Sequence, residues 1–426
     1  MVGIGIESEV ERGGMGCTRS KESDGVTGQD EGRTRGGQRA MAEMRLGGRS
    51  KYEVDGEGLE FDVCASDSDG PETAKLAPPS LSGPDRCGGL VFESTAVSHI
   101  GFGGLKHENQ DRYGTCTAGG PDGGGGLLFW VLDGHGSDGR RVAEVLHNAI
   151  PSVLRKRLAG LRDPENSSEV GEALVQGFDE LNRVALDASE AGEGRAEGAD
   201  GYVRGGLDLS LSGSTATVCY VSPSGGVYVA HVGDTRAVVY GELGKGLASG
   251  SWSSRDHRPE LPDERARIEA AGGRVAQRRN RTTGQAQGNH RLWERDSELP
   301  GLMISRSFGD TVAHGVGCTA VPEVAGPLRL NPECGNPAFL VLASDGVWDV
   351  LSQEHVGQVL RGDHAILSGT GRAIDVNGEP CQRALSKTAT RLAIEAISSW
   401  GKRHQADNVT LLLLRIGRAD CSASSP

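Results

Sequence analysis

Four apolar segments of the sequence each carry an aspartate at one end, and these four carboxylates are the residues best suited to chemistry. An aspartate at the end of a buried strand is costly to bury unless it has a partner, unlike one on a solvated face. The first opens the tetrapeptide Asp-Gly-His-Gly, whose glycines let a ligand or ion approach the main chain closely. The four residues are Asp133, Asp234, Asp345 and Asp407.

Carboxylates that converge from several strands repel one another, so each raises the pKa of the others. A divalent cation removes that repulsion, and sites built from oxygen ligands suit Mg²⁺ or Mn²⁺. The residues alone therefore predict a carboxylate-lined metal site at the end of a sheet. A structurally neutral turn at the end of a strand explains any one of these segments, but not their recurrence.

Composition excludes several classes of protein. The formal net charge of -13 argues against a nucleic-acid partner, which needs a basic stripe. The nine cysteines are odd in number and form no Cys-x-x-Cys pair, a pattern typical of a reducing compartment rather than of a disulfide framework or zinc site. No apolar run approaches the roughly 20 residues of a membrane span, and no signal peptide is visible. We expect a monomer in the cytoplasm, with membrane association or a nuclear location as the alternatives.

The chain is predicted to have one large folded part. Residues 1–90 are rich in Gly, Ser and charged residues without apolar periodicity, which indicates a disordered tail. Residues 91–418 form the predicted domain and 419–426 a short tail. Ser66–Gly70 resembles the start of a calcium loop but lacks the acid expected at its end, so a solvated acidic segment is the better interpretation.

Helices and short strands alternate in blocks along the domain, which favours an α+β layered fold. Apolar stripes predict helices over 142–150, with Pro151 kinking or ending the first, and over 170–185, 261–273 and 385–400. The strand 227–234 is expected to pair with 235–240 as a hairpin. The segments 188–212 and 277–290 are expected to be a surface insertion and a mobile loop.

The sequence resembles the PP2C (PPM) family of metal-dependent protein Ser/Thr phosphatases over roughly residues 95–418. Ten short segments occur in the family's order, and a single one would be weak support. The resemblance implies a four-layer αββα sandwich, two antiparallel sheets flanked by helix pairs. The segments are Gln110-Asp111, Asp133–Gly136, Gly213–Ala216, Val232–Arg236, Asp256–Pro259, Arg267–Gly273, Ser305–Asp310, Pro322–Val324, Ala343–Asp349 and Asp407-Asn408.

The resemblance also implies roles for individual residues. Asp133 matches the carboxylate that bridges two metals, and the Gly134 carbonyl matches a ligand of one of them. Asp345 and Asp407 match ligands of the other metal, and Asp111 matches an outer or water-mediated ligand. Asp234 matches the acid of a weaker third metal position, and His135 matches the general acid for the leaving oxygen. Asp310 matches a supporting aspartate, although a capping role is equally compatible with its position.

Two departures from the family pattern affect the details of the predicted site. Lys106 stands where the family usually has an arginine that grips the substrate phosphate, and lysine offers a point charge without a bidentate fork. Gln110 replaces the glutamate of the family's Glu-Asp pair, which removes one carboxylate from the metal shell. Some relatives have a similar Asn-Gln-Asp sequence, so we do not interpret Gln110 as inactivating.

The chemistry expected of such a site is hydrolysis of phosphoprotein substrates. Two cations lower the pKa of a shared water and neutralise charge on the phosphoryl oxygens during in-line attack. A cysteine-based mechanism has no support, because the loop His-Cys-x₅-Arg is absent. Two alternatives remain: a pseudophosphatase scaffold, which would need lost ligands, and a hydrolase of small phosphates, for which no P-loop is present. Four of the histidines without an assigned role are expected to be surface or loop residues: His107, His231, His257 and His290.

A possible acylation site lies in the N-terminal tail. Met15-Gly16-Cys17 begins a Met-Gly-x-x-x-Ser pattern for myristoylation, provided that translation starts at Met15. A single myristoyl chain binds membranes marginally, at about 10⁴ M⁻¹, so palmitoylation of Cys17 would have to supply the second anchor. Chance occurrence in a Gly-rich chain is the alternative explanation. Membrane association is therefore expected only for a chain that starts at Met15.

Overall fold

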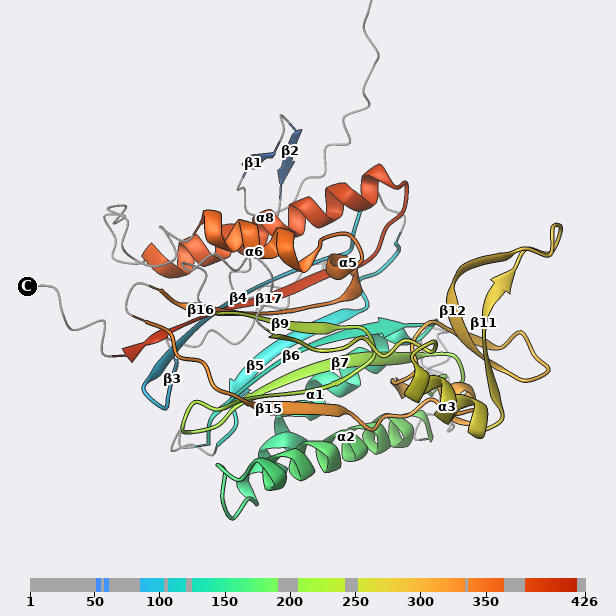
Figure 1. Cartoon of the computed structure of the whole chain (residues 1–426), viewed down its shortest axis with the longest axis horizontal. Helices are drawn as coiled ribbons and strands as arrows, with labels where there is room; N and C mark the ends of the chain where they lie inside the picture. The colour runs from blue at the N-terminus through green and yellow to red at the C-terminus, as the bar shows by residue number, and fades with distance from the viewer. Residues whose placement is uncertain are drawn as a thin grey trace, which may run out of the picture. The chain divides into compact units, whose positions relative to one another are not determined.

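The computed structural model describes residues 51–54, 57–60, 85–102, 106–119, 125–190, 206–241, 252–333, 336–363 and 380–419. Its main feature is a pair of antiparallel sheets, each covered on one side by helices (Figure 1). None of the helices in these ranges has the length and apolar character needed to cross a bilayer.

The first sheet has the strand order β15-β8-β7-β6-β5, and the two-residue strand β14 (Phe308–Gly309) pairs with β7. Its central strands are buried along nearly their whole length, as their continuous apolar runs predict. The strands are β5 (Asp111–Thr117), β6 (Leu127–His135), β7 (Gly213–Val221), β8 (Val227–Val232) and β15 (Glu323–Leu328).

The second sheet has the order β10-β9-β16-β17-β4-β3. The long strand β17 is central and pairs with β4 from Val409 opposite His99 to Arg418 opposite Leu90. This pairing joins segments that are more than 300 residues apart, so only tertiary structure brings them together. The strands are β3 (Asp85–Cys87), β4 (Leu90–His99), β9 (Arg236–Tyr240), β10 (Trp252–Ser253), β16 (Ala338–Ala343) and β17 (Val409–Arg418).

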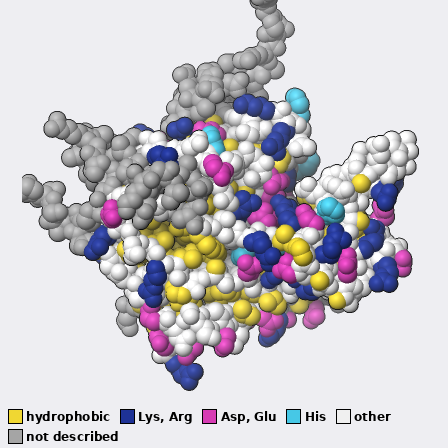
Figure 2. All heavy atoms as spheres, viewed as in Figure 1, with side chains coloured by type: hydrophobic (Ala, Val, Ile, Leu, Met, Phe, Trp, Pro, Cys, Tyr) yellow, Lys and Arg dark blue, Asp and Glu magenta, His cyan; other side chains and the backbone are white. Residues whose placement is uncertain are grey.

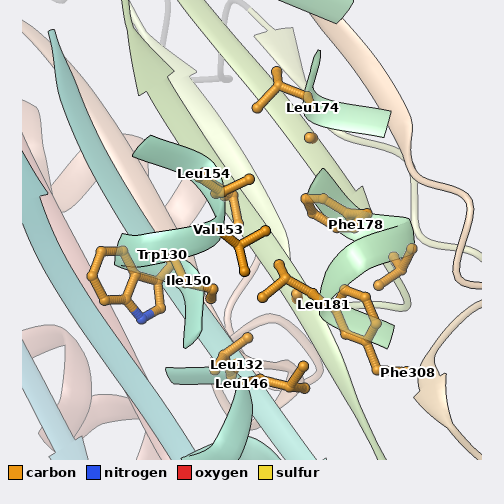
Figure 3. Packing of buried hydrophobic residues seen from close by; sticks show 14 of the residues in the cluster. Trp130, Leu132, Leu146, Ile150, Val153, Leu154, Leu174, Phe178, Leu181 and Phe308 are labelled. Carbon is orange, nitrogen blue, oxygen red and sulfur yellow. The ribbon is translucent and has the colours of Figure 1, made fainter. Parts of the chain in front are cut away.

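Helices α1 (Gly139–Ala159) and α2 (Ser167–Glu190) cover the outer face of the first sheet. Their apolar stripes pack onto strands β6 and β7 in a cluster that includes Trp130, Phe178 and Phe308 (Figure 3). Helices α5 (Asp345–Trp348), α6 (Gln353–Gly362) and α8 (Pro380–Lys402) cover the second sheet in the same way. A third cluster, with Phe92, Phe129 and Leu412 among its members, fills the space between the sheets.

This arrangement confirms the predicted α+β fold of two antiparallel sheets between helix layers. Each sheet has one apolar face toward its helices and the other toward its partner sheet, which is why the central strands are apolar on both faces. The sheet ends that carry the aspartates are therefore held by three separate cores.

A smaller unit of one helix and three strands projects from the pair of sheets (Figure 1). Helix α3 (Pro262–Ala270) begins with Pro262 and two acids, as its sequence predicts, and leads into strands β11 (Gly273–Arg279), β12 (Ala286–Glu294) and β13 (Pro300–Leu302). Ile268, Val275 and Leu292 form its small core. The prediction of a mobile loop over 277–290 is therefore wrong. The polar composition reflects an exposed hairpin with little apolar surface to bury, not the absence of strands.

Two further expectations are wrong. The strand 235–240 is not the hairpin mate of 227–234, because β9 pairs with β16 in the second sheet while β8 pairs with β7 and β15 in the first. Gly233, at φ 90°, takes the chain from one sheet to the other in a conformation that favours glycine. Helix α1 continues past Pro151 to Ala159, because Val153, Leu154 and Leu158 extend its buried stripe.

The N-terminal region differs from the predicted 90-residue disordered tail in two places. Strands β1 (Lys51–Val54) and β2 (Glu57–Glu60) pair as an antiparallel hairpin, flanking an Asp-Gly turn signal in the sequence. Strand β3 starts the second sheet at Asp85, six residues before the predicted boundary at residue 91. Ser66–Gly70 and Met15–Ser20 lie outside the described residues.

Candidate metal centre

Three of the four predicted carboxylates meet where the two sheets end on the same side of the molecule, and Asp407 is not among these three. Asp133, Asp234 and Asp345 each place a carboxylate oxygen within 4.8 Å of the others. Asp133 lies near the end of β6, Asp234 in the crossing from β8 to β9, and Asp345 at the start of α5 after β16. The cluster thus draws one ligand from each sheet and one from the crossing between them.

Asp111 stands beside this cluster on the neighbouring strand. Its Cα is the antiparallel partner of Asp133 in the pairing of β5 with β6. The Ser344 hydroxyl donates to Oδ2 of Asp111 at 2.8 Å, whereas the buried Oδ1 has no hydrogen-bond partner among the described residues. A buried carboxylate oxygen without a donor is in the condition that a cation, or water bound to one, would relieve.

Gly134 follows Asp133 where a side chain has no room. A Cβ at this position would lie 2.3 Å from the carbonyl oxygen of Gly139 and 2.8 Å from that of Gln110. The Gln110 side-chain amide donates to the Gly136 carbonyl at 2.9 Å. The amide that replaces the family's carboxylate therefore supports the Asp-Gly-His-Gly turn, a use that the sequence did not reveal.

Burial and mutual repulsion disfavour the ionised form of these carboxylates. Burial raises the pKa of Asp133 and Asp345 well above the usual range, and the charges of the neighbouring aspartates add to this. The pKa of Asp111 is raised to about 6, again chiefly by burial. Raised pKa values shared by several adjacent acids are typical of a group of carboxylates that binds cations.

Lys106 lies at the rim of the cluster. Its Nζ is 2.6 Å from Oδ1 of Asp407, and both side chains are about one-third exposed. Burial lowers the pKa of Lys106, but the charge and hydrogen bond of Asp407, joined by the more distant Asp133 and Asp345, leave it raised overall. Lys106 is therefore held as a cation beside the centre, where an anionic phosphate group would arrive.

Arg258 is a second cation at the centre, and the sequence analysis assigned it no role. Its guanidinium is 2.9 Å from Oδ2 of Asp234 and 3.5 Å from Oδ1 of Asp349. Asp349 is itself four residues after Asp345, so the two carboxylates share one side of the short helix α5. That spacing was the available signal for Asp349, whereas Arg258 was part of the quoted segment Asp256–Pro259 but had no predicted role.

His135 and Asp310 form a pair at the edge of the cluster. The Nε2 atom of His135 lies 2.7 Å from Oδ2 of Asp310, which also accepts from the Ser307 hydroxyl at 2.5 Å. Because a carboxylate only accepts, Nε2 carries the proton in this contact. Burial lowers the pKa of His135, and the Asp310 charge more than offsets this, so the pKa is raised overall.

Asn408 connects the segment before β5 to β17. Its side-chain amide donates to the carbonyls of Ile100 and Glu108, and its Oδ1 accepts from the backbone N–H of Gln110 at 3.0 Å. Asn408 thus fixes the segment that carries Lys106 and Asp111 against the strand that follows Asp407. The Asp407-Asn408 pair in the sequence did not indicate this role of the asparagine.

Two of the histidines expected at the surface are buried instead. His231, on β8, and His257 are 2% and 0% exposed, and their rings stack at a centroid distance of 4.5 Å. They form a second metal-compatible cluster with Glu323. However, Nδ1 of His257 accepts from the Gly233 N–H, which leaves the proton on Nε2, and rings only 11° from parallel do not aim two in-plane lone pairs at one ion. A structural role fits these contacts better.

The first cluster fits divalent cations by its donor set. Every candidate ligand is a carboxylate or backbone oxygen, the type preferred by Mg²⁺ and Mn²⁺ over softer metals. The cluster is crowded with negative charge, and Asp111 leaves a buried oxygen unpartnered. On this side of the molecule, acidic and basic side chains gather between the sheet ends and the base of the projecting hairpin (Figure 2).

An αββα sandwich with a carboxylate centre at its sheet ends defines the class of metal-dependent protein phosphatases. The family model for protein phosphatase 2C matches residues 126–387. The chain therefore belongs to the protein phosphatase 2C family and is a metal-dependent protein serine/threonine phosphatase.

Individual relatives agree with this assignment. Probable protein phosphatase 2C 73 of Arabidopsis thaliana is 30% identical over 284 residues, covering 66% of this chain and 67% of the relative. Probable protein phosphatase 2C 48 of rice (Oryza sativa subsp. japonica) is 33% identical over 269 residues, covering 60% and 70%. The crystal structure of serine-threonine phosphatase 2C from Toxoplasma gondii matches at a TM-score of 0.53 and 21% identity, over 80% of this chain and 100% of that one.

Proposed function

We propose that this protein hydrolyses phosphoserine and phosphothreonine in protein substrates at a centre that holds two Mg²⁺ or Mn²⁺ ions, with a weaker third position. The observation that carries the proposal is the convergence of Asp133, Asp234 and Asp345 within 4.8 Å. Asp133 and the Gly134 carbonyl would hold one cation. Asp133, Asp345 and Asp407 would hold the other. Asp234 would hold the weaker third cation, and Asp111 would contribute through water. Such ions activate water for attack on phosphorus and neutralise charge on the phosphoryl oxygens.

The side chains around this centre have distinct tasks in the proposed reaction. Lys106 attracts the phosphate group of the substrate, because its ammonium group is retained at the rim of the cluster. His135 holds a proton for the departing serine or threonine oxygen, and Asp310 fixes its ring through Nε2. Nδ1 of His135 is then the atom left to face the leaving group.

The direct test is phosphate release from phosphoserine and phosphothreonine peptides with and without Mn²⁺. Release should depend on the metal, stop with EDTA and resist thiol alkylation, since Cys87, Cys116, Cys219 and Cys318 are buried. The alternative, a pseudophosphatase scaffold, predicts peptide binding without metal-stimulated release. The convergence of Asp133, Asp234 and Asp345 supports the enzyme over the scaffold.

The location of the protein in the cell is proposed from the sequence alone. We propose a cytoplasmic enzyme that attaches to membranes through acylation of Gly16 and Cys17 when translation starts at Met15. Intact-mass spectrometry of the native protein decides between the two forms. A mature N-terminus at Met1 or Val2 without acyl mass would contradict the membrane-attached form.

A further inference from the structure

The hairpin of β11 and β12 is a basic element on an acidic protein. Between residues 274 and 293 the sequence has five arginines and no aspartate or glutamate, whereas the whole chain carries a formal net charge of -13. Three of the five, Arg278, Arg279 and Arg281, are exposed at the projecting end of the hairpin. The other two, Arg274 and Arg291, lie nearer its base and are half-buried.

None of these five arginines forms an ion pair with a carboxylate of the described residues. Arg279 donates to the Gly284 carbonyl and Arg291 to the Gly301 carbonyl, which satisfies hydrogen bonds but leaves the charge uncompensated. Arginines elsewhere on the surface behave differently: Arg157 pairs with Glu180, and Arg255 with Asp263. The hairpin therefore concentrates positive charge that the fold itself does not neutralise.

The arginines of the hairpin also repel one another. The pKa of Arg291 is lowered by burial and, after that, by the charge of Arg278. Gln277 pairs with His290 and Arg278 with Gln287 across a register shift, so the strand that faces Arg278 and Arg279 supplies no acid. An anionic partner would relieve this repulsion, which makes binding of negative charge favourable beyond simple attraction.

The base of the hairpin unit is fixed beside the metal centre. The backbone N–H of Ser305 donates to the His257 carbonyl at 2.9 Å, which joins the two ends of the excursion from 258 to 304. The first residue of this excursion, Arg258, contacts Asp234, and shortly after its end Asp310 contacts His135. When the phosphorylated residue of a polypeptide occupies the centre, the hairpin therefore lies beside the residues that flank it.

From these observations we infer that the hairpin is a docking surface for acidic residues that flank the phosphorylated residue of a protein substrate, with Arg278, Arg279 and Arg281 as the contacts. The inference rests on the proposed phosphatase function and adds a substrate class to it. A short acidic segment fits better than an extended polyanion, because the strongly negative remainder of the protein repels nucleic acid or an anionic membrane.

The test compares two phosphothreonine peptides of equal length, one rich in Asp and Glu around the phosphothreonine and one with Asn and Gln in their place. With the full-length protein and Mn²⁺ at low ionic strength, kcat/KM should favour the acidic peptide by about tenfold, the effect expected of a few screened charge pairs. In the triple variant Arg278→Gln, Arg279→Gln, Arg281→Gln that preference should disappear through KM, with kcat unchanged. The neutral peptide should be turned over equally by both proteins.

A charge-matched control removes three basic side chains far from the hairpin. The variant Lys156→Gln, Arg162→Gln, Arg183→Gln changes exposed residues on and between α1 and α2 and should keep the preference for the acidic peptide. Added salt should weaken the preference in the wild type and in this control alike. A wild type that treats the peptides equally, or a hairpin variant that keeps the preference, overturns the inference.

Direct binding separates this inference from the proposed function. If no peptide is hydrolysed, fluorescence anisotropy with the labelled acidic peptide still measures docking. Binding that is lost in the hairpin variant and kept in the control would support the docking surface while the phosphatase proposal fails. Tighter hairpin-dependent binding of double-stranded DNA or phosphatidylserine vesicles than of the acidic peptide would overturn the choice of partner.

Discussion

Glu264 and the aspartates of the metal centre are buried carboxylates in two different settings. Glu264, on α3, is fully buried and accepts hydrogen bonds from Arg267, Arg306 and the Ser305 hydroxyl. Although burial opposes ionisation, these three partners hold its pKa far below the usual range. At the centre, burial and neighbouring acids instead raise the pKa of Asp133 and Asp345.

The difference lies in where the positive charge comes from. Two guanidinium groups of the chain itself neutralise Glu264, so this carboxylate is part of the stability of the fold. The cations that the chain supplies to the centre, Lys106 and Arg258, lie beside Asp407 and Asp234 and leave Asp133 and Asp345 without an ion pair among the described residues. A buried acid that is neutralised by arginines of the same chain is structural, whereas a group of buried acids without enough neutralising cations indicates a binding site.

Replacing Asp133 or Asp345 by asparagine should give the largest effect. Phosphatase activity should fall by more than the roughly 10–100-fold cost of losing an outer-shell partner, because a direct metal ligand is removed. Without metal the variants should be at least as stable as the wild type, since one repelling charge is gone. Activity assays and thermal unfolding in EDTA measure the two outcomes, with the exposed Asp187→Asn as control. Full activity in either variant would contradict the metal assignment.

Glu264→Gln should lower stability, in contrast to the Asp133 and Asp345 variants. Losing the charge leaves Arg267 and Arg306 without their buried partner, and breaking such a pair costs about 3 kcal/mol in the free energy of unfolding. Urea denaturation measures this. Glu269→Gln, on the same helix and in an exposed pair with Arg265, is the matched control and should cost less than about 1 kcal/mol. Equal effects of the two variants would break the contrast between the two kinds of carboxylate.

The pH dependence of stability should also differ in sign. The pKa of Asp111 rises on folding from 3.8 to about 6, so in EDTA its contribution to stability is present below pH 4 and is lost as the pH rises through 6. Asp111→Asn should flatten that part of the melting-temperature profile. The pKa of Glu264 is depressed, so its contribution is present above its ordinary value of 4.5 and is lost as the pH falls below it. Profiles of the two variants that ran parallel to the wild type would contradict both assignments.

The smallest expected effect concerns the rim. Lys106→Arg should lower KM for a phosphopeptide severalfold by adding a bidentate fork, and Lys106→Ala should raise it by a similar factor. Gln110→Glu should lower the Mn²⁺ concentration needed for half-maximal rate, because a carboxylate returns next to the centre. Steady-state kinetics with varied peptide and metal measure both. Flat kinetics in both Lys106 variants would show that the substrate phosphate does not meet this side chain.

The sequence indicated the three acids that converge, Asp133, Asp234 and Asp345, because each stands at the end of an apolar run. It did not predict what surrounds them. The contacts of Arg258 with Asp234 and of Asn408 with Gln110 join residues distant in the sequence, and no local pattern encodes such pairs. The β11–β12 hairpin was missed because it buries few apolar side chains, so strand periodicity was weak.

The pairing of strand β17 with β4 determines the order in which the protein is completed during synthesis. The first sheet needs residues 111 to 328, whereas the second has to wait for residues 409–418, which fill the place between β16 and β4. Until then β4 and β16 present unpaired edges on the ribosome, the condition in which nascent chains aggregate or recruit chaperones. Asp407, which we propose as a metal ligand, directly precedes this last strand, so the proposed metal centre would stay incomplete in a nascent chain until the fold is closed.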